Sequence, residues 1–142
     1  MCLVAFAWNR HPDFGLIVGA NRDEWQDRPT APAAWWNDHP DILAGRDMRA
    51  GGTWMGVNRK GRFATVTNFR DPSDKRSMAR SRGELATAFL ANDATPEKFL
   101  STTKLRSHEY TVFNLIVGDT SSIAYFSSLR GEVETLPRAF TR

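Results

Sequence analysis

Short apolar runs separated by turn-forming residues dominate the first part of the chain. Residues 2–8 are apolar and aromatic, residues 9–15 combine a His-Pro-Asp sequence with a glycine, and residues 16–20 are apolar again. A short apolar run bounded by turn residues is typical of a buried strand. The pattern therefore predicts a β-hairpin that begins with the first residues of the chain.

The next stretch is rich in proline and tryptophan. Residues 28–40 hold three prolines and two tryptophans, and we interpret them as a loop packed down by its aromatic side chains. Further strands are expected around residues 42–45, at residues 51–57 with a glycine kink, and at residues 62–68. A turn is expected at residues 58–61. Residues 69–82 are polar and charged. They can form a solvated loop or a phosphate-binding patch, and the solvated loop is the simpler interpretation.

Two helix start signals follow. Ser81 and Glu84 have the spacing of a capping box, and apolar residues follow them at helical intervals. Thr95 precedes a proline, as at the start of a second helix. Strand patterns return at residues 110–117, 123–127 and 131–136. Strands, then a helical pair, then strands predict an α+β fold, because a doubly wound sheet would alternate strands with helices throughout.

Composition narrows the class of protein. The 142 residues are enough for one domain with its own core, and the formal charge of +3 is too weak to predict nucleic-acid binding. No apolar run approaches the length of a membrane span, and no basic region precedes the first apolar residues. A single cysteine allows no internal disulfide and favours a reducing compartment, so we expect a cytoplasmic protein. The three histidines and one cysteine have no familiar zinc-site spacing, and we expect no metal and no cofactor.

Cys2 is the residue with the most distinctive chemistry. An initiator methionine is usually removed when the next side chain is small, which would leave a cysteine with a thiol and a free α-amine. An α-amine has a pKa of about 7.7–8.0, so at neutral pH it can accept the proton of its own thiol. The alternative is an inert buried cysteine, because free cysteines are among the most buried residues.

Three further features have both a functional and a structural interpretation. Residues 21–24 (Asn-Arg-Asp-Glu) follow an apolar strand. In the functional interpretation, Asp23 pairs with the α-amine of Cys2 and Arg22 favours the Cys2 thiolate. In the structural interpretation, all four residues form a solvated turn. Asn68 ends a strand and can donate to an oxyanion or simply terminate the strand. The tryptophans, Trp54 among them, can line an apolar pocket or belong to the core.

Several motifs occur in a fixed order along the chain. They are Met1-Cys2 with Trp8, Asn21-Arg22-Asp23-Glu24, Gly45-Arg46-Asp47, Gly51-Gly52-Thr53-Trp54-Met55-Gly56-Val57, Thr67-Asn68-Phe69-Arg70, Ser81-Arg82-Gly83 and Asn114-Leu115-Ile116-Val117-Gly118-Asp119. Together they resemble the NRDE family, also called the transport and Golgi organisation protein 2 family, which is named for the tetrapeptide at residues 21–24. The resemblance extends to about residue 137 and implies a single family domain over residues 1–142.

The NRDE family in turn is similar to the cysteine N-terminal-nucleophile hydrolases, such as bile salt hydrolases and penicillin acylases. This resemblance implies a layered αββα sandwich and cleavage of a linear amide or acyl bond through an acyl-enzyme. Cys2 matches the nucleophile, Asp23 matches the aspartate near its amine, and Asn68 falls where those enzymes carry an asparagine near the oxyanion. Those hydrolases have an arginine where this chain has Ala20.

The resemblance leads to two expectations about function. The first is an amidohydrolase with Cys2, Asp23 and Asn68 as catalytic residues and Asn21, Arg22 and Trp54 as substrate-binding residues. The second is a non-catalytic carrier or chaperone of haem or acyl-lipid ligands, in which haem is cargo. Members of the family usually continue well past residue 137. We therefore expect the sandwich to be incomplete at its C-terminal end, catalysis to be weak, and uncovered sheet surface to favour a homo-oligomer.

Overall fold

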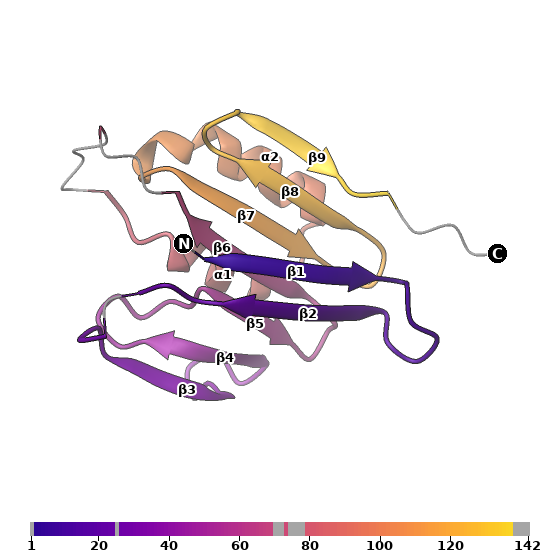
Figure 1. The fold of residues 1–142 in the computed structure, drawn as a ribbon, viewed down its shortest axis with the longest axis horizontal. Coiled ribbons are helices and arrows are strands. Elements are labelled where there is room, and N and C mark those ends of the chain that lie inside the picture. Colours follow the sequence, from indigo (N-terminus) through magenta and orange to yellow (C-terminus); the bar gives the residue numbers. More distant parts are fainter. Residues whose placement is uncertain (1, 25, 70–72, 74–78, 138–142) are drawn as a thin grey trace.

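The computed structural model describes residues 2–24, 26–69, 73 and 79–137 and contains two antiparallel sheets and two helices (Figure 1). This mixed arrangement confirms the predicted α+β class. The first sheet is a hairpin of β1 (Leu3–Trp8) and β2 (Leu16–Asn21). The second has seven strands in chain order: β3 (Thr30–Trp35), β4 (Ile42–Asp47), β5 (Met55–Asn58), β6 (Phe63–Asn68), β7 (Phe113–Gly118), β8 (Ile123–Ser127) and β9 (Glu132–Thr135). Helices α1 (Gly83–Leu90) and α2 (Pro96–Leu105) and the short 3-10 helix η1 (Ser107–Glu109) lie between β6 and β7.

The helices cover one face of the seven-stranded sheet. Helix α1 contacts β5, β6 and β7, whereas α2 contacts β8 and β9. Alternation along β7 turns Phe113, Leu115 and Val117 to this face, where all three are fully buried. Phe89 of α1 and Leu100 of α2 complete the contact. Each such side chain contributes about 1.5–3 kcal/mol on burial, so this interface is the core of the protein. The β1–β2 hairpin lies over the opposite face of the sheet (Figure 1).

The prediction of a loop at residues 28–40 is wrong, because β3 occupies its centre. Proline usually argues against a strand, since it lacks the N–H that a ladder requires. Here β3 is the edge strand, and its pairing with β4 shifts register between Ala31 and Ala34, on either side of Pro32. Edges and bulges are the positions where a strand tolerates proline. The predicted strand at residues 51–57 is also shorter, since β5 begins at Met55 after a turn with a positive φ at Gly51.

Of the two helix-capping signals predicted from the sequence, one is confirmed and one is wrong. Thr95 caps α2 as predicted, with its side chain accepting a hydrogen bond from the Lys98 N–H. The predicted capping box is wrong: the residue before α1 is already helical and makes no side-chain cap bond. Instead, the Glu84 carboxylate accepts a hydrogen bond from the Tyr110 hydroxyl. The start of α1 packs so tightly that a Cβ on Gly52 would lie 2.7 Å from the Gly83 carbonyl carbon.

The tryptophans do not gather in one pocket. Trp36 lies in the core and donates its indole N–H to the Ala44 carbonyl, whereas Trp35 is 44% exposed beneath the Arg59 guanidinium. Trp54 packs at the margin of the core. Trp25 lies outside the described residues. In the part of the chain that the structure describes, neither helix has the length and apolarity needed to cross a bilayer.

Candidate functional site

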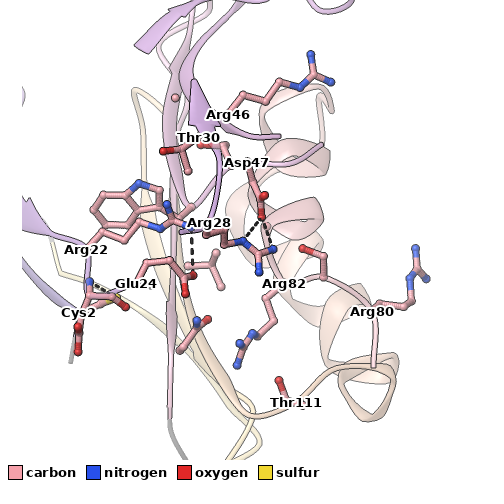
Figure 2. Close-up of a pocket in the computed structure, with 18 of the residues that line it drawn as sticks. Cys2, Arg22, Glu24, Arg28, Thr30, Arg46, Asp47, Arg80, Arg82 and Thr111 are labelled. Carbon is pink, nitrogen blue, oxygen red and sulfur yellow. Dashed lines mark hydrogen bonds and ion pairs between the residues drawn. The ribbon is translucent and has the colours of Figure 1, made fainter. Parts of the chain in front are cut away.

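A pocket of about 450 Å³ opens at one end of the seven-stranded sheet (Figure 2). Strands β2, β4 and β6 end there, and β1 begins there, so residues distant in the sequence meet. Its lining comprises Cys2, Arg22, Asp23, Glu24, Arg28, Thr30, Ala31, Gly45, Arg46, Asp47, Thr53, Trp54, Val66, Asn68, Ala79, Arg80, Ser81, Arg82, Gly83 and Thr111. Five of the six site residues expected from the sequence are therefore brought together.

The hairpin register places Cys2 beside Asp23. Leu3 pairs with Asn21 in the ladder, so the residues just before β1 and just after β2 are neighbours. The backbone N–H of Asp23 donates to the Cys2 Sγ at 3.4 Å, and the Asp23 carbonyl oxygen lies 4.0 Å from the same sulfur. A backbone N–H pointing at sulfur stabilises negative charge on it.

Asn21 is the predicted site residue that does not line the pocket. Its side-chain oxygen accepts a hydrogen bond from the Leu3 N–H at 3.2 Å. This bond closes the open end of the hairpin next to Cys2. In this geometry Asn21 shapes the site through the backbone, and its expected contact with substrate stays a prediction.

Charged residues line much of the pocket, and two ion pairs organise them. Arg22 lies 3.2 Å from Glu24, and Arg28 donates from Nε at 3.0 Å and from Nη2 at 2.5 Å to one oxygen of Asp47. Both pairs are mostly buried, with side-chain exposures of 22% and 23% for the first and 24% and 13% for the second.

Asp47 is held ionised by its surroundings. Burial alone would raise the pKa of its carboxyl, but the Arg28 guanidinium and the backbone N–H groups of Arg49 and Ala50 lower it below its ordinary value. The same hydrogen bond raises the pKa of Arg28. Asp47 therefore has two structural roles, because one oxygen binds Arg28 and the other closes the turn after β4.

The wall of the pocket that faces Cys2 is formed by β6 and by the residues at the start of α1. Asn68 is the last residue of β6 and is exposed to the pocket. The Trp54 carbonyl accepts a hydrogen bond from the Val66 N–H at 2.8 Å. Because Val66 and Asn68 belong to the same strand, this bond holds the Trp54 backbone close to Asn68. Arg82 donates to the Val112 carbonyl at 3.1 Å. In Figure 2, Arg28 and Arg82 point into the pocket, whereas Arg46 and Arg80 extend away from its centre.

Arg28, Asp47 and Arg82 are pocket residues for which the sequence alone suggested no role in a site. Asp47 and Arg82 belong to motifs of the family resemblance, which was the available signal for them. Arg28 had none, because its stretch was interpreted as loop. Among the described residues, no group of three or more histidine, cysteine or carboxylate side chains has the geometry to hold a metal ion.

This fold and pocket define an α+β protein with a cysteine at the end of a hairpin, facing a charge-lined cavity. The chain belongs to the Transport and Golgi organisation 2 family, whose model matches residues 1–140. The predicted membership of the NRDE family is thereby confirmed.

Relatives in animals support the same assignment. The chain is 36% identical to the Transport and Golgi organization protein 2 homolog of Homo sapiens and 35% identical to the Transport and Golgi organization 2 homolog of Mus musculus. In both cases 96% of this chain and 53% of the relative are aligned. It is 35% identical to Transport and Golgi organization protein 2 of Drosophila melanogaster over 46% of this chain and 25% of that protein. The chain spans about half the length of the human and mouse relatives.

Proposed function

We propose that this protein is an N-terminal-nucleophile hydrolase that cleaves a linear amide or acyl bond through Cys2. The observation that carries the proposal is the meeting of Cys2, Asp23 and Asn68 at one pocket, although they come from the start of β1, the end of β2 and the end of β6. Cys2 supplies the thiol and the α-amine that serves as its base, the Asp23 carboxylate is expected to orient that amine, and the Asn68 carboxamide is the oxyanion donor.

The reaction follows from the chemistry of these groups. After removal of Met1, the α-amine of Cys2 takes the thiol proton, and Sγ attacks the carbonyl carbon of the substrate. The Asn68 amide donates to the resulting oxyanion. The attack forms the C–S bond. Collapse of the tetrahedral intermediate then breaks the C–N bond and leaves the thioester, and the leaving amine takes the proton from the α-ammonium. Water then adds to the thioester, the C–S bond breaks, and the carboxylic acid and the thiol are released.

The layers of the fold support the same proposal. A hairpin sheet and a seven-stranded sheet lie face to face, with helices on the far side of the larger sheet (Figure 1). We propose that these layers correspond to the β, β and α layers of the αββα sandwich.

The lining of the pocket favours a polar substrate over a carried apolar ligand. Eight of its residues are charged, namely Arg22, Asp23, Glu24, Arg28, Arg46, Asp47, Arg80 and Arg82. Trp54 and Val66 are the large apolar side chains in the lining. A carrier of haem or of an acyl chain would bury its ligand against predominantly apolar walls. We infer that Trp54 contacts the substrate as one apolar wall of an otherwise charged site.

A burst experiment with p-nitrophenyl acetate tests the proposal. The activated ester should release about one nitrophenolate per protein in a rapid phase, followed by slow turnover, as expected for an acyl-enzyme. Cys2→Ala removes the only cysteine in the chain and should abolish the burst. A burst that persists in Cys2→Ala, or no burst in the unmodified protein, would contradict the proposal. A haem titration that shifts the Soret band equally in both proteins would favour the carrier.

A further inference from the structure

The hairpin that carries Cys2 is a separate sheet. Within the described residues, β1 and β2 pair with each other and with no strand of the seven-stranded sheet. Asn68 and Trp54 belong to the larger sheet and its β4–β5 connection. The distance between Cys2 and its partners across the pocket is therefore not fixed by a backbone ladder and depends on side chains.

Four alternating charges lead from the end of the hairpin to the larger sheet. Arg22 pairs with Glu24, and Arg28 pairs with Asp47 at the end of β4. The charge of Glu24 also acts on Arg28, as the smallest of the effects that raise the pKa of Arg28, so the two pairs interact through space. Figure 2 shows Glu24 between Arg22 and Arg28. All four side chains are mostly buried, so solvent screens this chain less than it screens an exposed ion pair.

We propose that Glu24 and Asp47 are positioning residues, which act through Arg22 and Arg28 to hold the Cys2–Asp23 end of the hairpin against the larger sheet. The inference rests on the proposed function, because it concerns the nucleophile. Asp23 lies between Arg22 and Glu24 in the sequence, so fixing those two side chains fixes the backbone N–H that points at the Cys2 sulfur. We call these four residues, Arg22, Glu24, Arg28 and Asp47, the ionic chain.

Whether the substitutions speed or slow the reaction of Cys2 distinguishes a positioning role from a purely electrostatic one. Glu24→Gln and Asp47→Asn each remove a negative charge close to the site. By Coulomb's law alone, either change should favour the Cys2 thiolate and speed its reaction with an electrophile. If the ionic chain holds the Asp23 N–H in place, the same substitutions loosen this donor and slow the reaction.

The experiment measures the rate at which iodoacetamide alkylates Cys2 at pH 7, followed by intact mass. We expect each variant to react roughly three- to tenfold more slowly than the unmodified protein, the size expected from loss of one hydrogen bond. The double variant should be no slower than the slower single variant, because either substitution breaks the same chain. Arg28→Lys keeps the charge but not the two-point contact, and should react at a rate between those of the unmodified protein and Asp47→Asn.

A control comes from a second ion pair, which joins Arg46 of β4 to Asp38, a residue that precedes β4 and does not line the pocket. Asp38→Asn removes the partner of Arg46, whose two guanidinium donors bind it at 2.6 and 2.7 Å, and should leave the alkylation rate unchanged. Asparagine at position 47 retains an oxygen acceptor for the turn. Should Asp47→Asn nevertheless lower the melting temperature, Glu24→Gln alone carries the test, because it leaves that turn intact.

The outcomes distinguish the two proposals. If both variants react as fast as the unmodified protein or faster, the positioning role is wrong while the proposed function stands. If Cys2 of the unmodified protein reacts no faster than a peptide of the same N-terminal sequence, the proposed function fails and the positioning role fails with it.

Discussion

Arg62 offers a sharp test of how α1 is held on the sheet. Its side chain is 6% exposed and reaches the C-terminal end of α1 from the start of β6. Nε donates to the Phe89 carbonyl at 3.1 Å and Nη2 donates to the Ala94 carbonyl at 2.9 Å. The guanidinium also lies 3.8 Å from the centre of the Phe89 ring. The cation adds a donor to the Phe89 carbonyl, which also accepts from the Asn92 N–H, and it faces the negative end of the helix dipole.

Arg62→Met keeps the apolar stem and removes the cation. Two hydrogen bonds from a charged donor contribute about 1.5–3 kcal/mol each. Burial lowers the pKa of Arg62, which means that desolvation of the cation offsets part of this gain. The net loss in free energy of unfolding should be about 2–4 kcal/mol, because two hydrogen bonds from a buried cation are lost together and only part of that loss is offset by the desolvation no longer required.

Urea denaturation followed by tryptophan fluorescence measures this loss. With a slope of about 2 kcal/mol per molar urea, the middle of the range for small proteins, the midpoint should fall by about 1–2 M. Lys60→Met is the control, since Lys60 and Asp93 form an ion pair whose side chains are 59% and 79% exposed, and its midpoint should not move measurably. A midpoint for Arg62→Met within experimental error of the control would refute the reasoning.

Three further predictions test local features of the fold. Gly52→Ala should lower the free energy of unfolding by about 1–3 kcal/mol in the same urea assay, because its Cβ would meet backbone atoms of Gly83 at 2.7 and 2.8 Å; an unchanged midpoint would contradict this close approach. Thr95→Ala should lose about 1 kcal/mol with the N-cap of α2, whereas Thr95→Ser should lose little. Arg106 and Arg80 lower the pKa of Glu109 from 4.5 to about 2, so stability present above pH 4.5 should fall as the pH drops towards 2. Glu109→Gln should flatten this part of the melting-temperature profile against pH.

The fold could be predicted where local pattern and tertiary context agree. Strand β7 was predicted because residues 110–117 alternate and end at a glycine, and the structure buries the same face against the helices. The hairpin was predicted from two apolar runs and one turn. Strand β3 was missed because proline is excluded from most strands but tolerated at an edge with a bulge, and edge position is a property of the whole sheet.

The site could be predicted only in part. Cys2 and Asp23 are neighbours because a hairpin returns the chain to its start, so their proximity followed from the predicted hairpin. Asn68 was a candidate because it ends a strand, and the family resemblance favoured the oxyanion role over the structural one. The ion pair of Arg28 with Asp47 depends on how the chain between β2 and β3 lies against the end of β4, and no periodicity in the sequence encodes that contact.

Intact-mass spectrometry of the protein quenched during reaction with p-nitrophenyl acetate tests the central claim most directly. The chain should begin at Cys2, without Met1, and carry one acetyl group that peptide mapping places on residue 2. This adduct should disappear on further incubation after the ester is exhausted, and Cys2→Ala should never acquire it. Retention of Met1 in essentially all molecules, or acetyl groups spread over lysine side chains with residue 2 unmodified, would contradict the assignment of Cys2 as the nucleophile.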